Sequence, residues 1–247
     1  MTRLSLPQLG LARPPALAGG VSPPPPAPVV ALGTPTVFKH PSGIATSWSF
    51  GGHTHAGGTN AGLIAVLGAR GLSGDAAWSL SWNGAAFTKA IELQNTGTAQ
   101  DARLLLAWLA APSTGAFDLV LDSAVDIYDA VVALFDATAM HQTAPIGQND
   151  THYETTGSHS TSSTGITGHA SSNLVLSAAT INLGTGCSVD AGFGELVDTT
   201  SDGGTGTSTT TLAIASRTGN TDPIAPTWTF GGSDNSVASF TAELVGA

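Results

Sequence analysis

Two groups of side chains in this 247-residue chain are of the types that can do chemistry. The first is His53-Thr54-His55, whose two imidazoles would share one face of an extended strand because side chains alternate with a period of two. The second is a window that holds five aspartates, Asp118, Asp122, Asp126, Asp129 and Asp136. Imidazoles bind metal ions, whereas carboxylates bind Ca²⁺ or act in pairs in glycoside hydrolysis.

Neither group has, nearby in the sequence, the further residues that a metal site or an active site needs. No Cys, Asp or Glu close to His53 and His55 supplies the rest of a tetrahedral zinc site, and the aspartates do not form an Asp-x-Asp-x-Asp-Gly loop. The chain also lacks a Gly-x-Ser-x-Gly elbow and the lysine of a P-loop. We expect a polar loop at 53–60, no catalytic residue and no cofactor, so the chain is interpreted as a non-enzyme. A metal at either group is the alternative that the sequence leaves open.

Charge and cysteine content exclude several other classes of function. The net charge is −10 with only seven Lys and Arg, so the clustered cations that bind nucleic acid or an anionic membrane are absent. No run of about 18 apolar residues predicts a membrane span. The single cysteine, Cys187, excludes an internal disulfide, and its place in an alternating apolar run predicts a buried, inert thiol.

The elements that must position these side chains are predicted to be β-strands throughout. Between Ala102 and Gly147, three apolar runs of strand length (102–112, 117–121 and 128–135) are separated by Pro, Gly, Ser and Asp. Asn83-Gly84 between two alternating runs is a strong hairpin signal. About a dozen such runs and no convincing helix predict an all-β fold, an antiparallel, jelly-roll-like β-sandwich, over residues 37–247.

Residues 1–36 differ in composition from the rest of the chain. Prolines fix the backbone and donate no hydrogen bond, so this segment is predicted to be an extended Pro-rich arm without a core of its own. A disordered tail is the simplest interpretation. Regularly spaced apolar residues favour instead an assembly arm that lies on a partner subunit. The residues predicted to contact that partner are Leu4, Leu6, Leu9, Leu11, Pro14, Pro15, Val29 and Val30.

The order of the strand signatures resembles a known family. The signatures are Ser47-Trp48-Ser49, Leu63 to Leu67, Leu80 to Thr88, Ala107 to Gly115, Val131 to Phe135 with Gln142 to Pro145, Trp228 to Ser233, and Phe240 to Leu244. From Val37 to the C-terminus, the chain resembles a jelly-roll-like β-sandwich domain of tailed-bacteriophage and gene-transfer-agent virion proteins. The resemblance implies a non-catalytic module for display, adhesion or particle decoration. The arm before Val37 departs from the pattern, as does Leu109, which stands where an aromatic hydroxyl is expected.

These observations predict a structural virion protein, assembled in the bacterial cytoplasm. A capsid decoration or head spike is the preferred position, and a tail component is next. The arm would contact capsid or other virion subunits, and the module is expected to form a homo-oligomer. The alternative function is a glycan-binding adhesion module of a tail fibre or cell surface that contacts host polysaccharide. Tyr153 or Trp78 would then provide a platform on which a sugar ring stacks.

Overall fold

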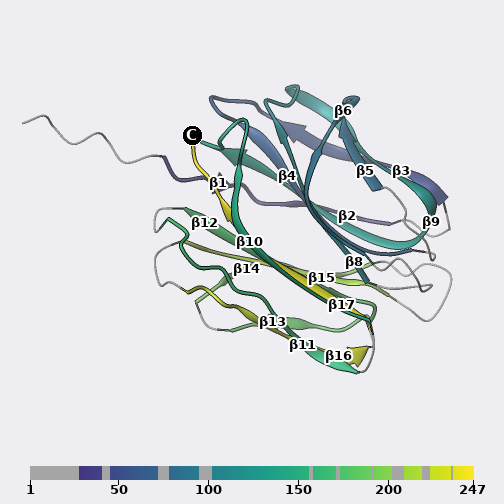
Figure 1. Cartoon of the computed structure of the whole chain (residues 1–247). Helices are drawn as coiled ribbons and strands as arrows, with labels where there is room; N and C mark the ends of the chain where they lie inside the picture. The colour runs from purple at the N-terminus through teal and green to yellow at the C-terminus, as the bar shows by residue number, and fades with distance from the viewer. Residues whose placement is uncertain are drawn as a thin grey trace, which may run out of the picture.

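The expectation of an all-β, antiparallel fold is confirmed. A computed structural model describes residues 28–40, 45–71, 78–94, 102–155, 158–170, 173–190, 192–201, 209–218, 223–234 and 236–247. This part of the chain contains no helix, and its strands form three antiparallel sheets. Figure 1 shows the sheets stacked in layers, with the largest sheet on one side, a five-stranded sheet in the middle and a three-stranded sheet on the other side.

Each strand belongs to one of the three sheets. The large, nine-stranded sheet contains β1 (Ala31–Leu32), β2 (Thr36–Lys39), β3 (Ala45–His55), β4 (Gly62–Gly71), β5 (Trp78–Trp82), β6 (Ala85–Ala86), β7 (Thr88–Leu93), β8 (Ala102–Ala110) and β9 (Gly115–Thr138). The five-stranded sheet has the order β10 (Ile146–Glu154), β17 (Val237–Leu244), β12 (Leu174–Ile181), β15 (Thr211–Thr218), β14 (Gly194–Thr200). The three-stranded sheet has the order β11 (His159–Ser163), β16 (Thr227–Asp234), β13 (Cys187–Val189).

Strand β9 is the centre of the large sheet. The sequence predicted two strands here, at 117–121 and 128–135, whereas the structure has one strand of 24 residues. In its first half, Leu121 lies between Trp48 of β3 and Leu80 of β5. In its second half, β2 and β4 replace them as partners. The strand therefore stays extended through the polar segment that was expected to interrupt it, although its pairing with β3 is irregular between Asp122 and Ile127, and the sheet nearly closes on itself.

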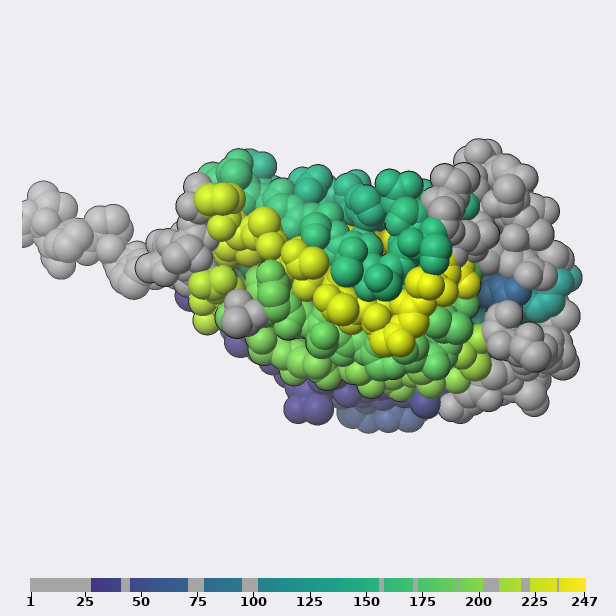
Figure 2. Space-filling model, turned by 90° about the horizontal axis from the view of Figure 1, so that it is seen from below, coloured from purple at the N-terminus to yellow at the C-terminus, as the bar shows by residue number. Residues whose placement is uncertain are grey.

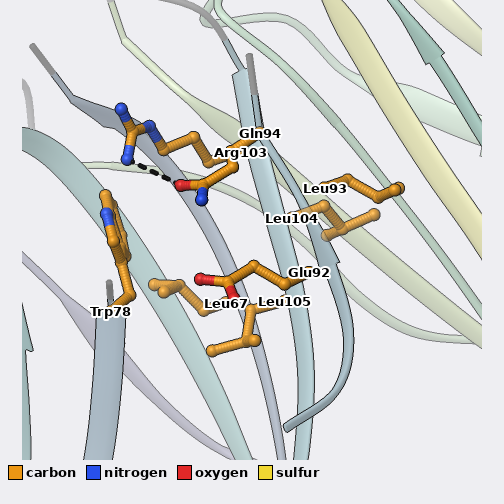
Figure 3. Close-up of a pocket in the computed structure, with 8 residues that line it drawn as sticks. All are labelled: Leu67, Trp78, Glu92, Leu93, Gln94, Arg103, Leu104 and Leu105. Atoms are coloured by element: carbon orange, nitrogen blue, oxygen red, sulfur yellow. Dashed lines mark hydrogen bonds between the residues drawn. The ribbon is translucent and has the colours of Figure 1, made fainter. Parts of the chain in front are cut away.

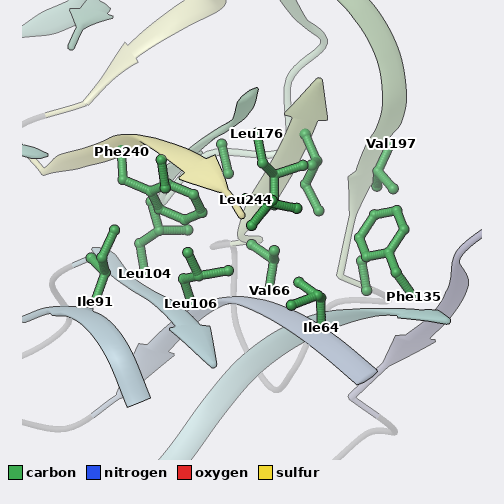
Figure 4. Packing of buried hydrophobic residues seen from close by; sticks show 14 of the residues in the cluster. Ile64, Val66, Ile91, Leu104, Leu106, Phe135, Leu176, Val197, Phe240 and Leu244 are labelled. Atoms are coloured by element: carbon green, nitrogen blue, oxygen red, sulfur yellow. The ribbon is translucent and has the colours of Figure 1, made fainter. Parts of the chain in front are cut away.

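Two apolar cores lie on the two faces of the large sheet. The curled inner face encloses one core, in which Trp82 is fully buried. The other face packs on the five-stranded sheet, and Figure 4 shows how Leu106 and Val66 meet Phe240 and Leu244 from the opposite layer. Strand β4 contributes side chains to both cores, which explains its unbroken apolar run.

A polar layer joins the five-stranded and three-stranded sheets beside a smaller apolar cluster. Trp228 Nε1 donates a hydrogen bond to Ser177 Oγ at 3.0 Å, and Ser162 Oγ lies 2.7 Å from Ser239 Oγ. All four side chains are buried, and their hydrogen bonds offset the cost of removing them from water. The second half of the chain, teal-green to yellow, forms most of the surface on this side of the molecule (Figure 2).

The folded body begins earlier than residue 37. Strands β1 and β2 pair with the second half of β9, and Val30 is only 2% exposed in the core between the two larger sheets. A Cβ placed on Gly246 would lie 1.8 Å from the Pro28 carbonyl oxygen, so the start of the described chain touches its C-terminal end.

Candidate functional site

The two groups of chemically capable side chains meet at one point of the large sheet. Strand β3 continues to His55, so His53 and His55 do not lie in a polar loop as predicted, and they are 5% and 2% exposed. Asp136 reaches both imidazoles from the second half of β9. His55 Nδ1 lies 2.5 Å from Asp136 Oδ1, and His53 Nε2 lies 3.4 Å from Asp136 Oδ2. Thr36 Oγ1 on β2 lies 2.8 Å from His53 Nδ1.

The contacts of this histidine–aspartate cluster (Thr36, His53, His55 and Asp136) fix the donor atom of one histidine. Because a carboxylate only accepts, His55 donates from Nδ1 to Asp136, whereas His53 Nε2 faces the carboxylate without forming a hydrogen bond. His53 Nδ1 and the Thr36 hydroxyl share a hydrogen bond. His55 Nε2 is buried and has no hydrogen-bond partner. The cluster thus links β2, β3 and β9 through polar contacts.

The geometry of the cluster does not suit a metal ion. Two ligands of one tetrahedral Zn²⁺ lie roughly 3.3 Å apart, since each bond is about 2.0–2.1 Å long. The 2.5 Å contact between His55 and Asp136 is a direct hydrogen bond that leaves no space for an ion between them. In the part of the chain that the structure describes, no three His, Cys, Asp or Glu side chains are grouped to hold a metal.

The remaining aspartates of the window do not converge. Asp118 and Asp122 are exposed and accept hydrogen bonds from Ser49 and Ser47 of the neighbouring strand. They are four residues apart on one face of β9, which separates them by roughly 13 Å. Glycosidase carboxylates are about 5–10 Å apart, so this pair does not have the spacing for that reaction. Asp129 is buried on the same strand.

Glu243 on β17 is a second buried carboxylate, and the sequence analysis did not identify it. It accepts hydrogen bonds from the Asn173 side-chain amide at 2.7 Å and from the backbone amides of Ala170 at 2.8 Å and Gln148 at 3.1 Å. Burial raises the pKa of this carboxyl, but the three hydrogen bonds and the nearby His169 outweigh burial and lower the pKa below its ordinary value. Glu243 therefore ties the segment before β12 and the edge strand β10 to β17.

The aromatic residues proposed for sugar stacking do not form one exposed platform. Trp78 is 3% exposed and lies under the guanidinium of Arg103, 5.1 Å from the ring centroid. Its ring belongs to the core inside the large sheet, so a sugar cannot stack on it in this structure. Tyr153 is half-buried and packs against the other core.

A small cavity lies beside Trp78. Figure 3 shows Arg103 donating to Gln94 Oε1, at 3.1 Å, with the Glu92 carboxylate below. The space measures about 10 Å³, which fits about one water molecule and is too small for an organic ligand. This cavity therefore does not qualify as a substrate pocket.

The arm residues are only partly within the described chain. Leu4, Leu6, Leu9, Leu11, Pro14 and Pro15 lie outside the described residues. Val29 is 41% exposed and available to a partner, whereas Val30 is buried in the protein's own core. Val30 therefore belongs to the folded body and cannot fill a groove on another subunit while the body is folded.

A shallow, open groove lies where β14, β13 and β16 come together. It consists of two neighbouring hollows of about 320 and 330 Å³, whose linings share Gly186 and Asp198. Cys187 adjoins the groove but is buried. Burial, with Asp198 and Glu195 nearby, raises the pKa of its thiol to about 12, so the thiol is protonated and unreactive at neutral pH.

Comparison of the chain with protein-family models, with curated proteins and with solved structures finds no match. The described residues include no helix long and apolar enough to cross a membrane.

Proposed function

We propose that this chain is a structural module of a phage-like particle, a capsid decoration or head spike that is attached through its N-terminal arm. The observation that carries the proposal is the way in which the start of the described chain is built into the body. Val30 is a core residue, and β1 and β2 pair with β9, the central strand of the large sheet. A load on residues before 28 would therefore be transmitted to the most extensively paired strand.

The arrangement of polar residues supports a role in assembly rather than in catalysis. The buried His55 bonds to the partly exposed Asp136, the buried His53 bonds to Thr36, and Glu243 is satisfied by three donors. Such contacts hold strands and loops in place. As part of the same proposal, the two larger sheets form a jelly-roll-like sandwich, the module assembles as a homo-oligomer, and it joins the particle in the bacterial cytoplasm.

The proposal is tested by limited trypsin digestion of the free chain and of the chain in its particle, with the fragments identified by mass spectrometry. Cleavage after Arg3 is expected in the free chain and protection in the particle, whereas Arg13 is not a site because Pro14 follows it. Lys89 on β7 is the control, because it reports the accessibility of the body in both states. Equal cleavage after Arg3 in the two states would contradict attachment through the arm.

A further inference from the structure

The groove around Gly186 and Asp198 has the shape of a shallow binding surface. Residues 184–186 connect β12 to β13 and form its floor, while Asp198 on edge strand β14 lies on one side. The second hollow continues between Asp198 and Thr229 of β16. Each hollow is at the lower end of the 300–1,000 Å³ range of ligand pockets, and the two linings share Gly186 and Asp198. Each hollow is wide open to solvent, so the groove suits a ligand that lies along the surface.

The lining of the groove combines hydroxyl and carboxylate groups with apolar surface in about equal measure. The polar side chains are Thr185, Ser188, Asp198, Thr199, Thr200 and Thr229. The one aromatic ring, Phe230, is buried and offers no open face. Asp198 Oδ2 accepts a hydrogen bond from the Cys187 backbone amide at 3.2 Å, whereas Oδ1 has no partner among the described residues. The groove can therefore donate and accept several hydrogen bonds and also offers apolar contact, mainly in the hollow beside Thr229.

Gly186 keeps the shared floor of the two hollows open. At Gly184 and Gly231 an added Cβ would lie 2.0 and 2.5 Å from a threonine hydroxyl oxygen, so packing within the chain excludes a side chain. At Gly186 the nearest atom to an added Cβ is Asp198 Oδ2 at 3.9 Å, and its backbone is not left-handed. The fold therefore tolerates a side chain at Gly186, and a side chain there would occupy the groove.

We propose that this groove binds an uncharged oligosaccharide, whose hydroxyl groups bond to Asp198 Oδ1 and to the surrounding hydroxyls. The inference deepens the adhesion function that the sequence suggested and does not depend on attachment to a particle. Asp198, nearby Glu195 and the net charge of −10 disfavour sialylated and uronic-acid sugars. Without a stacking ring, one groove binds with a Kd in the roughly millimolar range.

The test uses the full-length chain on an array of neutral and acidic oligosaccharides, followed by calorimetric titration of the best neutral ligand up to about 10 mM. Binding confined to neutral sugars is expected. Gly186→Val fills the groove, and Asp198→Asn retains the acceptor for the Cys187 amide but removes the charge. Each is expected to weaken binding by at least about tenfold while the unfolding temperature is unchanged.

Asp118→Asn is the matched control, because Asp118 is an exposed aspartate of β9 that does not line the groove. It is expected to bind like the unaltered chain. No binding to any neutral sugar, binding to acidic sugars alone, or binding that both groove variants leave intact would overturn the proposal. These readouts use the isolated chain, so they are independent of the protease protection that tests attachment through the arm.

Discussion

Replacement of Asp136 by Asn tests the histidine–aspartate cluster by a change of one atom. The carboxylate accepts a hydrogen bond from His55 Nδ1 and lies 3.4 Å from the second buried imidazole, His53, whereas a carboxamide is uncharged and has one accepting oxygen and one donating NH₂ group. In Asp136→Asn, His55 therefore loses the charge of its acceptor or faces the NH₂ group. His55 cannot escape by changing its tautomer, because its Nε2 is buried without an acceptor.

The expected loss of stability follows from the burial of these groups. A buried donor left without a partner costs about 1–3 kcal/mol. Asp136 is 36% exposed, so water replaces part of the lost bonding and the expected loss in the free energy of unfolding is about 1–2 kcal/mol. For a domain of this size, that loss corresponds to a decrease of roughly 2–8 °C in Tm.

The assay is urea unfolding at neutral pH, followed by tryptophan fluorescence and far-UV circular dichroism. Asp118→Asn is the control, because Asp118 is exposed on the same strand and accepts from a single serine hydroxyl. The control is expected to change stability by less than about 0.5 kcal/mol. An Asp136→Asn protein as stable as the unaltered chain, or a control that loses as much, would refute the reasoning.

Four further predictions concern stability and reactivity. In urea titrations, Val30→Ala should lower the free energy of unfolding by about 1–3 kcal/mol, whereas Val29→Ala should lower it by under about 0.5 kcal/mol. Equal effects of the two substitutions would place Val30 outside the core. Because folding lowers the pKa of Glu243, the stabilisation that this carboxylate provides is present above the unfolded-state pKa and lost as the pH falls through the folded-state pKa. In urea unfolding between pH 7 and pH 3, Glu243→Gln should therefore lose less stability on acidification than the unaltered chain. Identical pH profiles of the two proteins would argue against the effect. Gly147→Ala should cost about 1–3 kcal/mol, since its Cβ would lie 2.4 Å from a Glu243 oxygen, and an unchanged Tm would show that the carboxylate can move. Cys187 should resist thiol reagents such as DTNB at pH 8 until urea unfolds the chain, whereas rapid labelling of the native protein would contradict its burial.

Local patterns in the sequence were sufficient to predict most strands. The Asn83-Gly84 turn lies between β5 and β6 with φ of 48° and 76°, as the hairpin signal predicted. The apolar run from Leu63 to Leu67 is buried on both faces. The length of β9 was not predictable in the same way. Its polar middle has the composition of a turn, and only the change of partner strands keeps it extended.

The candidate sites depend on contacts between distant parts of the chain. His53 and His55 share a face as their spacing implied, but Asp136 is more than 80 residues away and reaches them only because β3 and β9 belong to one sheet. Glu243 has no local signal, since its three donors come from other segments. The groove likewise forms between loops and edge strands. The histidine–aspartate cluster, the surroundings of Glu243 and the groove are all determined by tertiary packing, and a periodic pattern in the sequence does not predict them.

The central claim, that the N-terminal arm attaches a folded body to a particle, is tested most directly by deletion of residues 1–27. The full chain and the 28–247 variant would be expressed in cells that assemble the particle and separated by gradient sedimentation. Circular dichroism and Tm would first establish that the variant is folded, as expected because Val30, β1 and β2 are retained. We predict that the full chain sediments with the particle and that the variant stays at the top of the gradient. Equal incorporation of the two proteins would contradict the account.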